Sequence, residues 1–127
     1  MLFHLDTDFL VYALSVRGPE REKLSELASS EAQIEISSVA WCEFSRGPRT
    51  AEQLAVARSF FGSDGIVPFS EDLAAAAAEA FRTLGSPRKR AADVAIGMTA
   101  AAAGAVLLTR NAKDFAAIPG LRVEAVA

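Results

Sequence analysis

Residues 2–8 read L-F-H-L-D-T-D, an apolar run that stops at two aspartates, Asp6 and Asp8. A short apolar run bounded by polar residues is typical of a buried strand. The residues that follow, 9–14, have the character of a helix. A strand that leads directly into a helix, with an acid at the junction, is the first unit of an α/β fold.

The same alternation continues along the rest of the chain. Short apolar or alternating stretches predict strands, and apolar residues at helical spacing predict helices. The predicted strands are residues 2–5, 33–37, 65–69, 105–109 and 121–126, and the predicted helices are residues 9–14, 20–29, 39–44, 50–61, 71–84 and 90–103, with one helical turn around Asp114. This order predicts a three-layer α/β/α sandwich with a central, mostly parallel sheet.

Length and composition fit one domain over residues 1–127, because 51% hydrophobic residues supply a substantial core. The N-terminus lacks the basic region of a signal peptide, and the longest uncharged run, residues 94–109, is too short to span a membrane. The single cysteine, Cys42, excludes an internal disulfide and a cysteine-based zinc site, and its apolar neighbours predict a place in the core. We therefore expect a cytoplasmic protein without membrane association.

Four acidic residues stand where apolar segments end or helices begin: Asp6, Glu43, Asp93 and Asp114. Ligands of parallel sheets bind beyond the carboxyl ends of the strands, and three of these acids follow predicted strands. Asp93 joins them if the start of its helix points the same way. Carboxylates gathered at one edge suit Mg²⁺, which prefers oxygen ligands. The net charge of −3 does not exclude a polyanionic substrate, because bound cations offset such carboxylates.

Each acid also has a purely structural explanation. Asp6 can cap the helix that follows it, and Asp8 and Asp93 can complement helix dipoles, although Asp8 can also be a supporting ligand. Asp114 can form a capping pair with Asn111, three residues before it. Glu43 lies on a helix that is apolar around most of its circumference, so we predict that its side chain is buried and that a metal ion or an arginine pairs with its charge.

Four motifs, in order along the whole chain, resemble those of the PIN-domain nucleases. They are L-D-T-D at residues 5–8, S-S-V-A-W-C-E-F at residues 37–44, D-V-A-I-G at residues 93–97 and T-R-N-A-K-D-F at residues 109–115. The pattern is most similar to the VapC-type toxins of bacterial toxin–antitoxin pairs, and its last motif is the most specific. The family often has asparagine in place of Asp8 and alanine in place of Gly97.

The resemblance implies a metal-dependent endoribonuclease that uses Mg²⁺ or Mn²⁺ and leaves a 5′-phosphate and a 3′-hydroxyl. It also implies a VapB-like antitoxin whose C-terminal segment occupies the active-site groove, and a homodimer, with apolar helices such as residues 50–61 as candidate surfaces. Within the site, we expect Asp6 and Asp93 to be the principal ligands, and Glu43 and Asp114 to complete the shell or to orient the attacking water.

Other residues near the acids are candidates for supporting roles. Thr7, Thr109 and Asn111 can orient the ligands or contact phosphate, although a strand end and a helix cap explain them equally well. The candidate contacts to the RNA backbone are basic residues close in sequence to the acids, namely Arg88, Lys89, Arg90 and Arg110.

Two other functions remain open from the sequence. One is a PIN-like scaffold that binds RNA or a protein without cutting. The other is a phosphatase of the haloacid-dehalogenase type, with Asp6 as the nucleophile. That class needs a suitably placed lysine, for which Lys113 is a poor match, and it has no role for Glu43.

Overall fold

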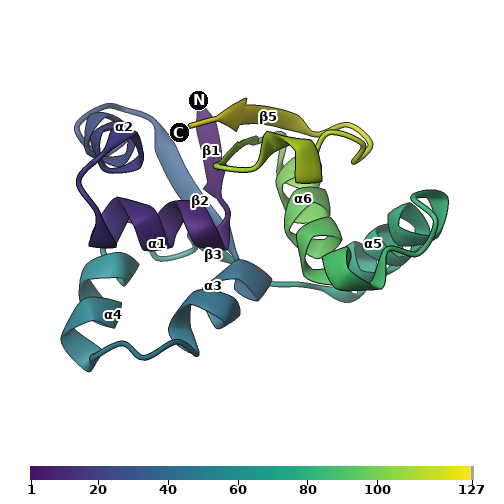
Figure 1. Ribbon diagram of the computed structural model, residues 1–127, viewed down its shortest axis with the longest axis horizontal. Helices are drawn as coiled ribbons and strands as arrows, with labels where there is room; N and C mark the ends of the chain where they lie inside the picture. Colours follow the sequence, from purple (N-terminus) through teal and green to yellow (C-terminus); the bar gives the residue numbers. More distant parts are fainter. Residues whose placement is uncertain (127) are drawn as a thin grey trace.

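The computed structural model describes residues 1–126 (Figure 1). Its strands are β1 (Leu2–Leu5), β2 (Gln33–Ser37), β3 (Ile66–Val67), β4 (Val106–Thr109) and β5 (Arg122–Ala125). Its α-helices are α1 (Thr7–Ser15), α2 (Pro19–Ala28), α3 (Ser38–Ser45), α4 (Ala51–Arg58), α5 (Glu71–Thr83) and α6 (Ala91–Ala103). Two short 3-10 turns, η1 (Arg88–Arg90) and η2 (Ala112–Asp114), precede α6 and follow β4.

The five strands form one sheet in the order β3-β2-β1-β4-β5, and every pair is parallel. The strand order reverses at β1, which pairs with β2 on one side and with β4 on the other. The β1–β4 junction is therefore the topological switch point, where ligands of open parallel sheets bind. The backbone N–H of Asp6 donates to the carbonyl of Leu108 at 3.2 Å and extends this pairing beyond β1.

Helices cover both faces of the sheet. Figure 1 shows α1, α2 and α4 on one side of the strands and α5 and α6 on the other. All four residues of β4 are buried, as expected for a central parallel strand with both faces covered. The predicted α/β/α sandwich is therefore confirmed. Within residues 1–126, no helix is both long enough and apolar enough to cross a membrane.

Local capping explains several of the element boundaries. The Ser37 hydroxyl accepts from the N–H of Ala40 and caps the start of α3. Thr50 and Gln53 form a reciprocal capping box at the start of α4. Gly104 ends α6 in the left-handed conformation, with φ of 68°, which glycine adopts without steric cost.

Three expectations from the sequence were wrong in detail. The helix predicted over residues 50–61 ends at Arg58, because the next residues form tight turns closed by backbone hydrogen bonds. The strand predicted over residues 65–69 has only two paired residues, because its register matches only the end of β2. Cys42 is exposed, since α3 buries Ala40 and Phe44 and Cys42 lies on the opposite side of that helix.

Gly97, on α6, permits close contact between this helix and the segment that follows β4. A Cβ atom on Gly97 would lie 2.4 Å from Cδ1 of Ile118 and 3.2 Å from Cδ2 of Leu121. The glycine therefore lets the segment after β4 pack directly onto the helix.

Gly65 provides a test of how tightly the β2–β3 edge is built. A Cβ atom at Gly65 would lie 2.7 Å from the backbone N of Gly62, whereas one at Gly62 would meet nothing within 4 Å. We predict that Gly65→Ala lowers the unfolding free energy by about 1–3 kcal/mol, because backbone cannot move aside as a side chain can. Gly62→Ala is the matched control and is expected to be neutral. Equal urea midpoints for the two variants would contradict this explanation.

Candidate active site

The fold brings the four predicted acids to one cavity. Asp6 lies between β1 and α1, Glu43 is on α3, Asp93 is in the first turn of α6 and Asp114 ends η2. All four line a cavity of about 260 Å³. The remaining lining residues are Thr7, Asp8, Arg46, Ile96, Asn111 and Phe115. Segments more than 100 residues apart in sequence therefore share one site beyond the carboxyl edge of the sheet.

Asp6 is held in one orientation by two hydrogen bonds. Its Oδ1 accepts from the backbone N–H of Phe9 at 2.7 Å, so Asp6 caps α1, as one explanation of the sequence proposed. Its Oδ2 accepts from the Thr109 hydroxyl at 2.5 Å. That hydroxyl in turn accepts from the N–H of Asn111 at 3.0 Å. The helix cap and the cavity position of Asp6 thus coexist.

Burial raises the pKa of Asp6 to about 6, because only 5% of the residue is exposed to water. The hydrogen bonds from Thr109 and Phe9 oppose this rise, and the negative charges of Asp8 and Asp93 add to it. A carboxyl group in this state gives up its proton less readily than an ordinary aspartate. A nearby positive charge would therefore stabilise its ionised form.

Glu43 is half-buried, less than predicted, and one of its oxygens is hydrogen-bonded to a threonine. The Thr7 hydroxyl donates to Oε1 of Glu43 at 2.8 Å and joins α1 to α3. Thr7 thus takes the supporting position that was one of its predicted roles. Within residues 1–126, Oε2 of Glu43 has no hydrogen-bond partner, so it can accept a proton or contact a cation.

Asp93 and Asp114 lie close to each other and to one arginine. Burial raises the pKa of Asp93, the negative charges of Asp114 and Glu43 raise it further, and Arg90 opposes them. Nη2 of Arg90 lies 3.3 Å from Oδ1 of Asp114 in a partly exposed ion pair. Asn111 makes no side-chain capping bond, so the capping pair considered for Asp114 is absent from the described residues.

The supporting residues predicted from the sequence divide into two groups. Thr7 and Asn111 line the cavity, and Thr109 reaches it through Asp6. The four basic residues predicted to contact RNA do not line the cavity. Three of them, Arg88, Lys89 and Arg90, are exposed on η1. Cζ of Arg110 lies 3.5 Å from the centre of the Tyr12 ring, and its Nε lies 3.3 Å from Oε2 of Glu20.

Arg46 is the cavity residue that the sequence reasoning missed. It follows Glu43 by three residues on α3, a spacing that puts two side chains on one face of a helix. That spacing was the signal in the sequence. Arg49, the next arginine along the chain, does not line this cavity, and its guanidinium donates to the carbonyl of Phe44.

The donor set of the cavity fits a hard divalent cation. All of its acidic side chains offer oxygen, and it contains neither histidine nor cysteine. Within residues 1–126, no three such side chains stand close enough together to enclose a metal ion by themselves. Mg²⁺ rarely requires that, because it keeps several waters and uses one or two carboxylates. The cavity therefore fits Mg²⁺ or Mn²⁺ better than it fits a metal that needs a complete protein cage.

The PIN-domain family model matches residues 4–121 of this chain. The chain belongs to the PIN-domain family. The match spans all four acids, and the resemblance found in the sequence motifs is confirmed. No curated protein sequence matches this PIN domain significantly.

Several solved structures share the architecture of this PIN domain. A chain of VapBC2 from Rickettsia felis, bound to a promoter DNA fragment, is 26% identical over 98% of both chains, with a TM-score of 0.77. A toxin–antitoxin complex from Klebsiella pneumoniae contains a chain 30% identical over 93% of both chains, with a TM-score of 0.69. DNA-bound VapBC from Salmonella typhimurium, at 24% identity over 98% of both chains and a TM-score of 0.73, has the same fold.

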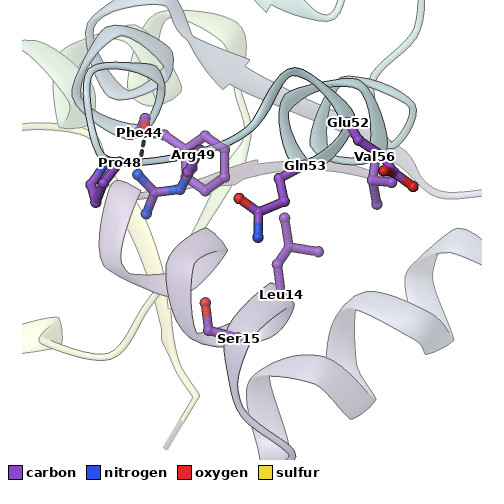
Figure 2. A pocket seen from close by; sticks show the side chains of 8 residues that line it. All are labelled: Leu14, Ser15, Phe44, Pro48, Arg49, Glu52, Gln53 and Val56. Carbon is purple, nitrogen blue, oxygen red and sulfur yellow. Dashed lines mark hydrogen bonds between the residues drawn. The ribbon is translucent and has the colours of Figure 1, made fainter.

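This PIN domain has a second cavity, of about 370 Å³, between α1, α3 and α4 (Figure 2). Leu14, Phe44, Pro48 and Val56 give it an apolar wall. Figure 2 shows Leu14 and Val56 on facing elements, with the Arg49–Phe44 hydrogen bond at one end of the cavity. Phe44 follows Glu43 in sequence, so α3 contributes to both cavities.

Asp6 should make the metal-free PIN domain less stable as the pH rises. Its pKa is about 6 in the folded state and 3.8 ordinarily, so the unfolded chain loses this proton first. The stability associated with the protonated form is complete below about pH 4 and is lost by about pH 6. In EDTA, Asp6→Asn should therefore exceed the wild type in unfolding free energy by on the order of 2–3 kcal/mol above pH 6.

Urea denaturation of both proteins across this pH range measures the difference. Asparagine keeps an oxygen for the Phe9 cap and, like the protonated carboxyl group, carries no charge. Asp64→Asn, at an exposed position outside the cavity, is the control and should give no such divergence. A wild type that gains stability relative to Asp6→Asn between pH 4 and pH 6 would refute the effect.

Proposed function

We propose that this chain is a single nuclease domain over residues 1–127, a metal-dependent endoribonuclease that acts as a VapC-type toxin. The main support is the meeting of Asp6, Glu43, Asp93 and Asp114 in one cavity at the switch point of a parallel sheet. Membership of the PIN family and similarity to chains from toxin–antitoxin complexes support the same class of activity.

Asp6 and Asp93 are the proposed principal ligands of Mg²⁺ or Mn²⁺, with Glu43 and Asp114 completing the site. Burial and neighbouring carboxylates raise the pKa of Asp6 and of Asp93, so a positive charge would stabilise the ionised form of both. The bound ion supplies charge that offsets the carboxylates and stabilises the phosphate as its negative charge grows.

The side chains of the domain determine the geometry of the hydrolysis. The backbone N–H of Phe9 and the Thr109 hydroxyl each hold one oxygen of Asp6, and the Thr7 hydroxyl holds one oxygen of Glu43. The other oxygen of Glu43 is free to take a proton from the attacking water. The water oxygen bonds to phosphorus while the bond to the 3′-oxygen breaks, and that oxygen takes up a proton. The ends produced are a 5′-phosphate and a 3′-hydroxyl.

Digestion of total cellular RNA by the purified domain tests this function. We predict cutting with Mg²⁺ or Mn²⁺, none in EDTA, and a loss of at least about 100-fold in rate for Asp93→Asn, because a carboxylate at the metal is removed. Asp64→Asn is the matched control, since it removes a carboxylate outside the cavity. It should retain full activity.

The outcome also separates the alternative functions. If the folded wild-type domain binds RNA with metal present but cuts no faster than Asp93→Asn, the non-catalytic scaffold is favoured. A covalent phosphate on Asp6 would indicate the phosphatase. Lys113, the lysine which that reaction would need, does not line the cavity in the described residues. A homodimer remains a prediction, to be checked by sedimentation.

We also propose a VapB-like protein antitoxin as the partner, docked through the apolar cavity of Figure 2. The structures with similar chains are complexes of toxin with antitoxin. Val56 lines this cavity and is 51% exposed, so an apolar side chain of a partner can cover it. The cavity shares α3 with the carboxylate site, so a bound segment can extend from one to the other.

Val56→Asp should weaken binding of the proposed VapB-like antitoxin by at least about tenfold, because it buries a charge in an apolar contact. Titration calorimetry measures the affinity. RNA cleavage by the free variant should be unchanged, since Val56 lies outside the carboxylate cavity. Unaltered affinity would place the partner on another surface.

A further inference from the structure

Most of the 13 lysines and arginines of this chain already have a partner within residues 1–126. Arg110 and Arg90 are examples, since each forms an ion pair with an acidic side chain. An arginine held in this way loses that contact when it turns to a ligand. The side chains with no hydrogen bond or ion pair in the described residues are Arg17, Arg46, Arg82, Arg88, Lys89 and Lys113.

Of these unpaired cations, only Arg46 lines the carboxylate cavity in the described part of the chain. The same cavity is lined by five carboxylates, yet the guanidinium of Arg46 pairs with none of them. Its backbone is fixed as the residue that ends α3, where its N–H donates to the carbonyl of Cys42 at 3.0 Å. The backbone of Arg46 is therefore held in place, while its guanidinium group is available to bind a ligand at the cavity.

The guanidinium group fits this place for a chemical reason. Its planar fork can donate two parallel hydrogen bonds to the oxygens of a phosphate, which a lysine cannot do. A cavity lined by carboxylates repels a phosphodiester strand unless a positive group attracts its phosphates and positions the strand. A positive group on the same wall as Glu43, one helical turn away, can do so.

We propose that Arg46 binds the non-bridging oxygens of an RNA phosphate at the carboxylate cavity and positions the strand for cleavage. This inference rests on the proposed nuclease function and identifies a substrate-contacting residue of that site. It moves the expected phosphate contact from Arg88, Lys89, Arg90 and Arg110 to the one unpaired cation that the structure places in the cavity.

RNA binding without cleavage tests the contact directly. The experiment uses the full chain carrying Asp93→Asn to suppress cutting, a fluorescently labelled single-stranded RNA of mixed sequence, and Mn²⁺. Anisotropy titrations at several salt concentrations give both the affinity and its salt dependence. Arg46→Gln should weaken binding at least about tenfold, as expected for a charged hydrogen bond, and should reduce the slope of log K against log salt by about 0.7.

Three controls separate the contact from other effects. Arg82→Gln removes another exposed, unpaired arginine that does not line the cavity, and it should leave both quantities unchanged. Arg46→Lys keeps the charge but loses the planar fork, so the salt slope should survive while part of the affinity is lost. Calorimetric titration with Mn²⁺ should give the same affinity with and without Arg46→Gln.

The outcomes distinguish this inference from the function on which it rests. If the parent protein binds and the wild type cuts RNA, while Arg46→Gln binds as tightly as Arg82→Gln, the proposal is overturned and the nuclease function stands. An Arg46→Gln effect that disappears when Mn²⁺ affinity is restored by excess metal would also overturn it. If the wild type neither binds nor cuts RNA, the proposed function fails, and the inference fails with it.

Discussion

The hydrogen bond from the Thr109 hydroxyl to the Asp6 carboxylate, 2.5 Å long, joins the two strands at which the sheet reverses its order. Through it, the end of β4 and the end of β1 converge on a single buried acid. The other oxygen of Asp6 begins α1, and the Thr109 hydroxyl also receives the N–H of Asn111 as the chain turns towards Asp114. This contact and the two beside it hold the end of β1, the start of α1, the end of β4 and the turn towards Asp114 together at the cavity.

Burial of the same carboxylate makes the site electrostatically costly. An aspartate that serves only as a helix cap is usually exposed, whereas Asp6 is buried, and its pKa rises to about 6 in spite of two donors. The pKa of Asp93 is also raised, by burial and by the negative charges of Asp114 and Glu43. The domain thus keeps acids where they reduce its own stability, which is typical of a site selected for function rather than for folding.

Helix α3 connects the parts of the molecule to which roles have been assigned. Glu43 and Arg46 face the carboxylate cavity, while Phe44, between them in sequence, lines the apolar cavity towards α4. Arg49 lies against the Phe44 ring, 4.0 Å from its centre, and donates to its carbonyl. Because Glu43 and Phe44 are neighbours on one short helix, α3 physically links the apolar cavity to the carboxylate cavity.

The sequence alone determined β1, β2 and the end of α6, because a buried strand, a half-buried strand and a helix-ending glycine are local patterns. It also singled out four acids by their places at the ends of strands and the starts of helices. Only the tertiary structure decided that they share a cavity, that Cys42 is exposed, and which arginines are already paired. Those facts depend on contacts between residues far apart in the sequence, such as Arg110 and Glu20, which are separated by 90 residues. The spacing of residues in a sequence carries no information about which distant partner a side chain meets.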